Sequence, residues 1–218
     1  MNINSLVTTI EGPGIAVDID ETLSWTIGYW IEEMQKKFGN PENLTIKEMV
    51  EKYRYTQNVP YWQHEEALEW VDLKINSNET QEMLPLIDGS SAYLKKINKI
   101  VPIVAYITAR PERVIEGTRK WLNKHKFPEA PVICRPNEVE SSKGNEWKAK
   151  VIESLYPNVW GIIDDNAKLL DFLSADYKGK VFMYEHGDNL GYPFAIACKD
   201  WLTVYEQILS VYKDYKAT

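Results

Sequence analysis

Three apolar runs end in acidic or hydroxyl side chains, and this feature constrains the fold more than any other. The runs begin at Gly14, Val104 and Gly161 and lead into three motifs: Asp18-Ile19-Asp20-Glu21-Thr22, Thr108-Ala109-Arg110 and Asp164-Asp165-Asn166. Near-continuous Val/Ile runs are typical of parallel strands buried on both faces. Ligand sites in open α/β sheets lie just beyond the carboxyl ends of such strands. The sequence therefore predicts a parallel sheet with an acidic site at one edge.

The chain beyond residue 88 alternates regularly between strand-like and helical segments. Strands are expected at residues 100–108, 132–135, 159–164 and 181–184, and helices at 90–98, 111–125, 144–155, 167–173 and 197–212. Alternation of this length predicts right-handed crossovers and a doubly wound sheet. The first strand, residues 15–19, belongs to the same sheet. The expected fold class is therefore α/β, with a Rossmann-like doubly wound parallel sheet.

Residues 23–88 contain no strand-like run and predict a helical insert. Apolar residues recur there at helical spacing: Leu23, Ile27, Trp30, Met34 and Phe38. The motif Thr45-Ile46-Lys47-Glu48 predicts a capping box at the start of a second helix, and residues 62–75 predict a third. We therefore expect a core domain of residues 1–22 and 89–218. Residues 23–88 form a cap domain over the carboxyl edge of its sheet.

Composition narrows the choice of partners. The 218 residues are 44% hydrophobic and 26% charged, as in ordinary globular proteins, and the formal net charge is −7. Because nucleic-acid binding depends on Lys and Arg to neutralise phosphates, this balance speaks against a long polynucleotide partner. A small phosphorylated molecule held by a metal ion escapes this objection, since the cation supplies the positive charge. The oligomeric state is left open.

The sequence also indicates a compartment. No apolar stretch reaches the length of a membrane span, and residues 1–14 lack the basic-then-apolar order of a signal peptide. Cys134 and Cys198 do not have the spacing of a disulfide framework or a metal cluster, and Cys134 is expected to be a buried strand thiol. We therefore expect a cytoplasmic protein with no membrane partner.

The motifs together resemble the signature of the haloacid dehalogenase (HAD) superfamily: Asp-x-Asp-x-Thr, then Thr or Ser, then Lys, then an acidic pair. The resemblance covers most of the chain and implies a magnesium-dependent phosphohydrolase that acts on a small phosphorylated metabolite. It implies that Asp18 attacks phosphorus and that Asp20 is the general acid and base. The implied Mg²⁺ ligands are a carboxylate oxygen of Asp18, the backbone carbonyl of Asp20, and Asp165, with Asp164 acting through water.

The chemistry of the acids agrees with these roles. Asp18 and Asp20 share a face because alternate residues of a strand do so. A carboxylate nucleophile divides a difficult displacement into two steps through an aspartyl-phosphate. The adjacent carboxylates of Asp164 and Asp165 repel each other unless a cation lies nearby. The structural alternatives are that Asp18 and Asp20 only begin a turn or cap the following helix, and that Asp165 caps the helix after it.

Thr108 marks the expected phosphate site. Its hydroxyl and the N–H groups of Ala109 and Arg110 are placed to bind phosphate at the start of a helix from Pro111, where the helix dipole favours an anion. Alternatively, Thr108 only caps that helix. Arg110 contacts either the phosphate or a carboxylate of the acidic cluster, and the sequence does not separate these two roles.

Three lysines precede the acidic pair: Lys143, Lys148 and Lys150. The helix expected at 144–155 has an apolar face, and at about 100° per residue Lys148 falls in the middle of it while Lys150 falls well outside. A lysine on a core-facing stripe is costly unless it is paired. We therefore expect Lys148 to balance the phosphate charge. The alternatives are that Lys148 extends past the core to water and that Lys143 reaches the site from its loop.

Further residues bear on the substrate. The presence of Asp20 argues against dehalogenation, because that branch lacks the second acid, and Glu21 stands where glycine is frequent in the family. The chain resembles the deoxyribonucleotidase branch in the position of its insert and in the segments 107–112, 118–122 and 199–204. This resemblance implies a nucleoside 5′-monophosphate as the expected substrate. The alternatives are a nucleic-acid end-processing phosphatase and a non-catalytic binding module.

The insert is rich in aromatic residues: Trp25, Tyr29, Trp30, Tyr53, Tyr55, Tyr61, Trp62 and Trp70. Stacking of an aromatic side chain on a base contributes about 1–3 kcal/mol, so some of these rings are candidates for base binding. The alternative is that they pack a small helical bundle, as expected for Trp30 on the periodic stripe. The segments 53–55 and 61–64, which flank a turn, are the better candidates for stacking.

Overall fold

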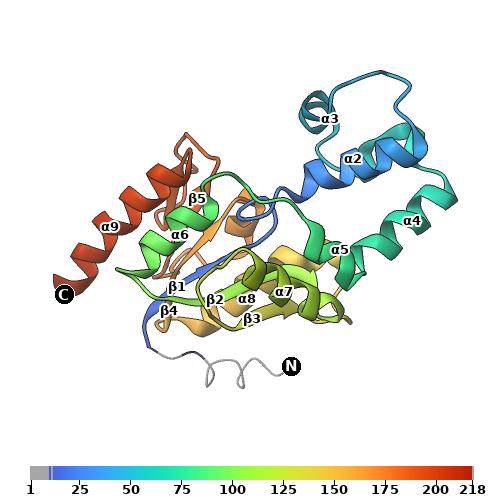
Figure 1. Cartoon of the computed structure of the whole chain (residues 1–218). Coiled ribbons are helices and arrows are strands. Elements are labelled where there is room, and N and C mark those ends of the chain that lie inside the picture. Colours follow the sequence, from blue (N-terminus) through green and yellow to red (C-terminus); the bar gives the residue numbers. More distant parts are fainter. Residues whose placement is uncertain (1–9, 11, 218) are drawn as a thin grey trace.

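The computed structural model describes residue 10 and residues 12–217, and a six-stranded sheet lies at the centre of this part of the chain (Figure 1). Its strands are β1 (Gly14–Val17), β2 (Ile103–Pro111), β3 (Val132–Arg135), β4 (Val159–Asp164), β5 (Lys180–Tyr184) and β6 (Ala195–Cys198). The order is β3-β2-β1-β4-β5-β6, and every neighbouring pair is parallel. The predicted doubly wound parallel sheet is confirmed.

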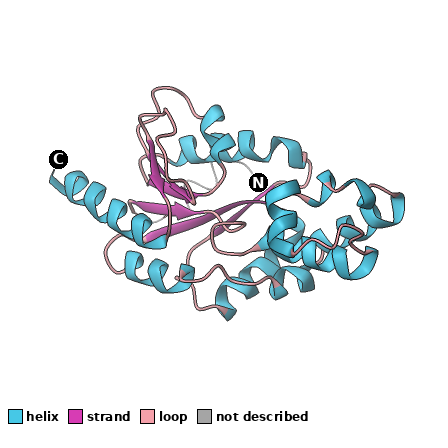
Figure 2. Cartoon of the chain, turned by 90° about the horizontal axis from the view of Figure 1, so that it is seen from above, coloured by secondary structure: helices cyan, strands magenta, loops and turns pink. Residues whose placement is uncertain are grey.

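Helices cover both faces of this sheet (Figure 2). One face carries α6 (Ser90–Asn98), α7 (Ile115–Lys124) and α9 (Trp201–Ala217), and the other carries α8 (Gly144–Leu155) and the 3₁₀ segment η5 (Ala167–Phe172). Within β1, Ile15 and Val17 pack into the first of these layers and Ala16 into the second. Burial on both faces explains why the strands read as continuous apolar runs.

The strand order reverses at β1, which lies between β2 and β4. β1 ends one residue before Asp18, and β4 ends at Asp164. In open α/β sheets the crevice at such a switch point is where ligands bind. The fold therefore brings the first and last acidic motifs to the same edge, as the sequence predicts.

Residues 23–88 form the expected helical insert. It contains α2 (Thr26–Phe38), α3 (Ile46–Tyr53), α4 (Glu65–Ile75), α5 (Asn78–Met83) and the 3₁₀ turns η1 (Thr56–Asn58) and η2 (Pro60–Trp62). In Figure 1, α2, α3 and α4 stand away from the sheet. They surround a hydrophobic cluster of their own, whose buried members are Ile31, Met34, Met49, Val59, Trp62 and Ala67. The division into two domains stays a prediction.

Local sequence signals place several elements correctly. The helices at 90–98 and 144–155 and the strands at 132–135 and 159–164 have the predicted bounds. The capping box before α3 is present, because Thr45 Oγ1 accepts from the Glu48 N–H at 3.3 Å and Glu48 Oε2 accepts from the Thr45 N–H at 2.8 Å. Both cysteines are free and buried.

The helix predicted from residue 197 begins later, because a strand precedes it. Residues 195–198 pair in parallel with β5 as the sheet-edge strand β6. The helix α9 starts only at Trp201, where Asp200 Oδ1 accepts from the Thr203 N–H at 2.7 Å. The short run Ala-Ile-Ala-Cys lacks the length that identifies the other strands, so the prediction was wrong there.

The strand β2 also differs from its predicted bounds. It starts at Ile103 and continues through Pro111, which pairs with Arg135 of β3. A 3₁₀ turn at Glu112–Val114 follows, and α7 begins at Ile115. The expected helix start at Pro111 is therefore wrong, since pairing with β3 keeps this segment extended.

Two differences lie in the insert. The third helix begins at Glu65 rather than at residue 62, because Trp62 belongs to a 3₁₀ turn. The helix α5 was not expected, and it packs on α7, where Asn78 Oδ1 accepts from the Gly117 N–H at 2.7 Å.

Among the described residues, no helix combines the length and the apolar character needed to cross a membrane. The expectation that the chain has no signal peptide concerns residues 1–14. Residues 1–9 and 11 of this stretch lie outside the described residues.

Candidate active site

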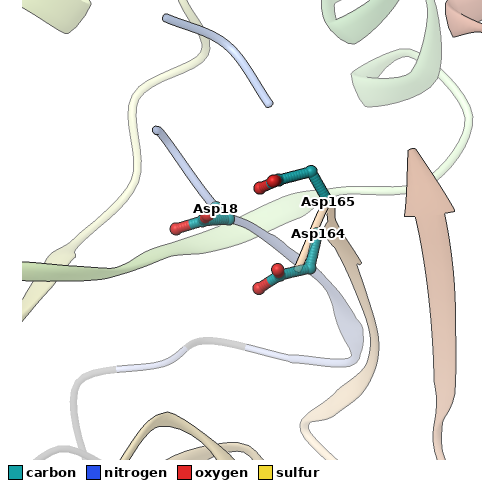
Figure 3. Close-up of side chains that lie close together, drawn as sticks. All are labelled: Asp18, Asp164 and Asp165. Atoms are coloured by element: carbon teal, nitrogen blue, oxygen red, sulfur yellow. The ribbon is translucent and has the colours of Figure 1, made fainter. Parts of the chain in front are cut away.

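Three carboxylates meet at the switch point of the sheet. Asp18 follows β1, Asp164 ends β4 and Asp165 follows it, and one oxygen of each lies within 4.8 Å of the others. Figure 3 shows the three side chains extending to the same side of their strands. All three are buried, with exposed fractions of 5%, 0% and 9%. The predicted meeting of the first and last motifs is confirmed.

Lys148 lies between two of these acids. Its Nζ is 2.8 Å from Asp18 Oδ1 and 2.8 Å from Asp164 Oδ2, and the residue is 2% exposed. Burial opposes its charge, but Asp164 and Asp18 outweigh this and raise the pKa of Lys148 above its ordinary value. The side chain therefore stays charged within the site, and the alternative that it extends to water is wrong.

The two other lysines lie on the surface. Lys150 is exposed and pairs with Glu146 at 2.6 Å along the same helix. Lys143, at the end of the 3₁₀ turn before α8, is also exposed. The helical-face argument thus placed Lys148 and Lys150 correctly.

The acidic cluster carries more negative charge than Lys148 balances. Burial raises the pKa of Asp18 to about 7; the Lys148 charge opposes this shift, and Asp164 and Asp20 add to it. Burial also raises the pKa of Asp165 well above its ordinary value, with Asp164 and Asp18 adding to the effect. Buried carboxylates that lack sufficient positive charge favour protonation or a bound cation. This donor set of hard oxygens fits a divalent ion such as Mg²⁺.

Hydrogen bonds distinguish Asp164 from Asp165. Asp164 Oδ2 accepts from Lys148 at 2.8 Å, and Oδ1 accepts from the Asn166 N–H at 2.9 Å. Asp165 Oδ1 has a longer bond, at 3.3 Å, from the hydroxyl of Thr22. Asp164 is thus held by the protein through both oxygens, and the roles of Asp165 as a direct ligand and of Asp164 as a ligand through water stay predictions.

Arg110 binds Asp20, which is one of the two contacts that the sequence left open for this arginine. Its Nη2 donates to Asp20 Oδ1 at 2.7 Å and its Nε to both carboxylate oxygens at 3.1 and 3.0 Å, while the Thr26 hydroxyl donates to Oδ1 at 2.6 Å. Burial would raise the pKa of Asp20, but the charge and hydrogen bonds of Arg110 dominate and lower it. Asp20 is therefore ionised in this arrangement.

The segment predicted to bind phosphate, residues 108–110, has a different backbone structure from the one expected. Thr108 is fully buried, and its Oγ1 accepts from the Arg110 N–H at 3.2 Å, while Ala109 lines the cavity over the acids. The segment remains part of β2, so no helix begins at Pro111 and the expected helix dipole is not present behind this segment. The alternative role of Thr108 as a helix cap is wrong for the same reason.

A cavity of about 360 Å³ opens above the acids, between the sheet edge and the insert. The insert contributes Ile27, Trp30, Tyr55, Thr56, Gln57 and Ile75 to its wall. Ser141 comes from the 3₁₀ turn before α8, and Asn145 comes from the start of α8. Sequence reasoning missed Gln57, Ser141 and Asn145. These polar residues lie outside the apolar runs that marked the site, so no periodic signal identified them.

The aromatic candidates divide into packing and cavity residues. Trp62 is fully buried in the cluster of the insert, and its Nε1 donates to the Gly39 carbonyl at 2.9 Å, so it offers no face to a ligand. Tyr55 is half-buried and lines the cavity, and its hydroxyl accepts from Arg54 Nε at 3.2 Å. Trp30, expected in the core, is buried and also contributes to the cavity wall.

Glu21 occupies a left-handed backbone conformation, with φ at 56°. Glycine adopts this region without strain, whereas residues with a side chain occupy it rarely. The Glu21 side chain turns back so that Oε1 accepts from the Ile27 N–H at 2.5 Å, and burial raises its pKa to about 7. Glu21 thus helps to hold the turn between β1 and the insert.

No protein-family model matches the chain, and no curated protein matches its sequence. Among solved structures, a Thermotoga maritima protein assigned as a β-phosphoglucomutase superposes with a TM-score of 0.55 at 16% identity, covering 93% of this chain and 99% of its own. A HAD-superfamily hydrolase of subfamily IA from Geobacter sulfurreducens PCA superposes with a TM-score of 0.54 at 11% identity, covering 90% and 96%. The chain has the HAD fold.

A predicted phosphatase from Clostridium acetobutylicum gives a similar match, with a TM-score of 0.50 at 14% identity and coverage of 91% of this chain and 100% of its own. The matched share is high in both chains, so the likeness is not confined to one segment of either. At these identities the comparison establishes the HAD fold, and the chemistry must be argued from the site.

Proposed function

We propose that this protein is a magnesium-dependent phosphatase that hydrolyses a small phosphomonoester through an aspartyl-phosphate on Asp18. The observation that carries the proposal is the contact of Lys148 with both Asp18 and Asp164 at 2.8 Å, in a buried cluster that Asp165 completes. One carboxylate oriented by a lysine, beside a second acid held by Arg110, is a suitable arrangement for phosphoryl transfer to the protein.

The residues present fit Mg²⁺. Asp18 and Asp165 would hold the ion directly together with the backbone carbonyl of Asp20, and Asp164 would act through water. Oxygen ligands and one or two carboxylates are what Mg²⁺ selects, and the ion would balance the excess negative charge of the cluster. When bound, the ion would neutralise charge on the phosphoryl oxygens.

The chain's own residues divide the reaction into two steps. A carboxylate oxygen of Asp18 attacks phosphorus, the bond to the leaving oxygen breaks, and Asp20 gives that oxygen a proton. Water then attacks the aspartyl-phosphate, Asp20 takes the proton from the water, and phosphate leaves with Asp18 restored. Asp20 is ionised before substrate arrives; the negative charge of the incoming phosphoryl group raises its pKa, so that Asp20 takes up a proton from solvent before the first step.

The cavity favours a substrate with an uncharged leaving group. Among the described residues that line it, Lys148 is the one cation, and it is already bound by Asp18 and Asp164. No wall residue is therefore available to neutralise a second phosphate or a carboxylate. Apolar side chains of the insert, including Ile27 and Ile75, instead suit a leaving group with an apolar face.

A nucleoside 5′-monophosphate meets these requirements best. Its single phosphate would lie at the acids, and its base would lie against the insert, where Tyr55 offers a ring to stack on. The net charge of −7 speaks against the alternative of a nucleic-acid end-processing enzyme. All residues of the motifs are present and Lys148 engages two of the acids, which speaks against a non-catalytic module. We also propose a cytoplasmic location.

We further propose that residues 23–88 form a cap domain inserted into the core. The two ends of the insert lie together, since the Ile87 N–H donates to the Leu23 carbonyl at 2.9 Å and the Trp25 N–H to the Pro85 carbonyl at 3.0 Å. Entry and exit at one point are typical of an inserted domain. Limited proteolysis should cut first in the loops of the insert and leave the core intact; initial cleavage within the sheet would contradict the division.

A substrate panel tests the proposed function. Phosphate release would be measured with Mg²⁺ on nucleoside 5′-monophosphates, nucleoside 3′,5′-bisphosphates, sugar phosphates, phosphoglycolate and para-nitrophenyl phosphate. We expect the highest kcat/KM for a nucleoside monophosphate and a lower value for the matching bisphosphate. Release from none of them would favour the non-catalytic module, and preference for oligonucleotide ends with a salt-dependent KM would favour the end-processing enzyme.

A further inference from the structure

Arg135, the last residue of β3, is a buried cation that the two-step chemistry does not use. It is 7% exposed, and none of the ion pairs formed by the described residues includes it. Burial lowers the pKa of its guanidinium, and the nearby charge of Arg113 adds to this effect. A buried charge without a counter-ion is costly, so a purely structural role does not readily explain it.

The side chain of Arg135 holds the backbone of the phosphate segment, residues 108–111. Here the register between β2 and β3 is irregular, because Thr108 pairs with Cys134 and Pro111 pairs with the next residue of β3. Arg135 Nε donates to the Ala109 carbonyl at 3.0 Å. The Arg110 N–H at the other end of the same peptide group donates to Thr108 Oγ1 at 3.2 Å. This peptide is therefore fixed at both its oxygen and its nitrogen.

The same arginine connects this segment to the helix that carries Lys148. Its Nη1 donates to the carbonyl of Val139, in the loop that leads to α8. Gly144, the first residue of α8, packs so closely that a Cβ there would lie 3.2 Å from Ala109 Cβ and 3.8 Å from Arg135 Cδ. Arg135 thus lies where the phosphate segment, the preceding loop and α8 meet.

The other cations near the acids are already committed to carboxylates. Arg110 binds Asp20, and Lys148 binds Asp18 and Asp164. The guanidinium of Arg135 has no carboxylate partner among the described residues. It donates to the carbonyl of Ala109, and Ala109 lines the cavity.

We propose that Arg135 is a positioning residue for phosphoryl transfer, which fixes the Ala109 backbone against α8 and supplies uncompensated positive charge behind the phosphate segment. The inference rests on the proposed phosphatase function. Arg135 acts through Ala109 and does not need to touch the substrate. It therefore affects binding of the phosphoryl group and does not itself exchange the proton with the leaving oxygen, which is the role proposed for Asp20.

The test compares three variants. Arg135→Gln removes the charge, and Arg135→Lys keeps it but cannot bind two carbonyls through a planar fork. Arg113→Gln is the matched control, an exposed arginine of the same region that donates to Asn137 Oδ1 at 3.0 Å. The readouts are kcat and KM on para-nitrophenyl phosphate and on an alkyl phosphate, the inhibition constant of inorganic phosphate, and the melting temperature.

We expect Arg135→Gln to lower kcat/KM by at least about tenfold, because small misplacements of a reacting group are costly. The loss should be equal on the two substrates, and the inhibition constant of phosphate should rise with it. Arg135→Lys should restore part of the phosphate binding while its kcat stays low. Arg113→Gln should match the wild type.

The outcomes separate a kinetic role from a structural one. A folded Arg135→Gln with unchanged kcat/KM and unchanged phosphate inhibition overturns the inference, even if its melting temperature falls. If that variant does not fold, Arg135→Lys decides: low kcat at an unchanged melting temperature supports the inference, and wild-type kinetics overturns it. Absence of wild-type turnover contradicts the proposed phosphatase instead, and calorimetry of inorganic phosphate with Mg²⁺ on wild type and Arg135→Gln then tests Arg135 by itself.

Discussion

Removal of the Lys148 amine should abolish most of the activity and weaken the fold. Its Nζ lies 2.8 Å from both Asp18 and Asp164, and the three side chains are almost fully buried. In Lys148→Ala, two carboxylates remain buried without a cation. Breaking a buried ion pair by removing one partner costs about 3–5 kcal/mol of stability. We expect a loss in this range at neutral pH, with part of it recovered when the carboxylates are protonated at lower pH or when Mg²⁺ is bound.

The expected loss in rate follows from the same contacts. Lys148 orients Asp18 and balances charge that develops on the phosphoryl group, and removal of one such electrostatic contact costs at least about a hundredfold in rate. Lys150→Ala is the matched control from the same helix: its side chain is 64% exposed and pairs only with Glu146, so it should change stability by about 0.5 kcal/mol or less. Lys143→Ala, at an exposed position, should also be near wild type.

The assay is kcat for phosphate release at saturating Mg²⁺, on variants whose folding is checked by circular dichroism and urea unfolding. The reasoning is refuted if a folded Lys148→Ala retains activity within tenfold of wild type. Loss of activity in Lys143→Ala with an active Lys148→Ala would show that the loop lysine balances the phosphate.

Two further predictions concern the second acid and the insert. Asp20→Asn should reduce turnover of an alkyl phosphate far more than that of para-nitrophenyl phosphate, because a good leaving group needs less protonation; equal losses would contradict the general-acid role. Tyr55→Ala should raise KM for nucleotides more than for para-nitrophenyl phosphate. Equal KM changes on both substrates in Tyr55→Ala would exclude stacking. Trp62 is fully buried, so Trp62→Ala should instead lower the free energy of unfolding by about 3–5 kcal/mol.

Local signals in the sequence were sufficient for most of the core. Strands buried on both faces are continuously apolar, so the sequence predicted β1, β2 and β4. It also placed Asp18 after β1 and the pair Asp164 and Asp165 at the end of β4. The position of Lys148 followed from helical geometry, because a charge on an apolar face must find a partner inside. The capping box at Thr45 located α3, since it depends only on residues three apart.

Features that depend on distant partners were not accessible from the sequence. The sequence offered a carboxylate of the acidic cluster as one partner of Arg110 but did not identify Asp20, because the two residues lie 90 positions apart and the packing of β2 beside β1 brings them together. The strand β6 is short, and its pairing with β5 rather than its composition defines it. The extension of β2 to Pro111 likewise depends on β3, and it removed the helix start that was expected to bind phosphate.

The cavity wall also has a tertiary origin. Gln57 of the insert and Asn145 of α8 face the same cavity although they lie far apart in the sequence. Trp62 and Tyr55 are neighbours in an aromatic segment, yet one is buried in the cluster of the insert and the other reaches the cavity. Composition alone does not separate these two environments.

The most direct test of the central claim is metal-dependent phosphate release by wild type and Asp18→Asn, measured side by side on the best substrate of the panel. The variant is isosteric and removes only the charge of the nucleophile. The account predicts turnover by the wild type with Mg²⁺, loss in chelator, recovery when Mg²⁺ is restored, and no turnover by a folded Asp18→Asn under any of these conditions. Full wild-type turnover in chelator, or clear Mg²⁺-dependent turnover by Asp18→Asn, would contradict it.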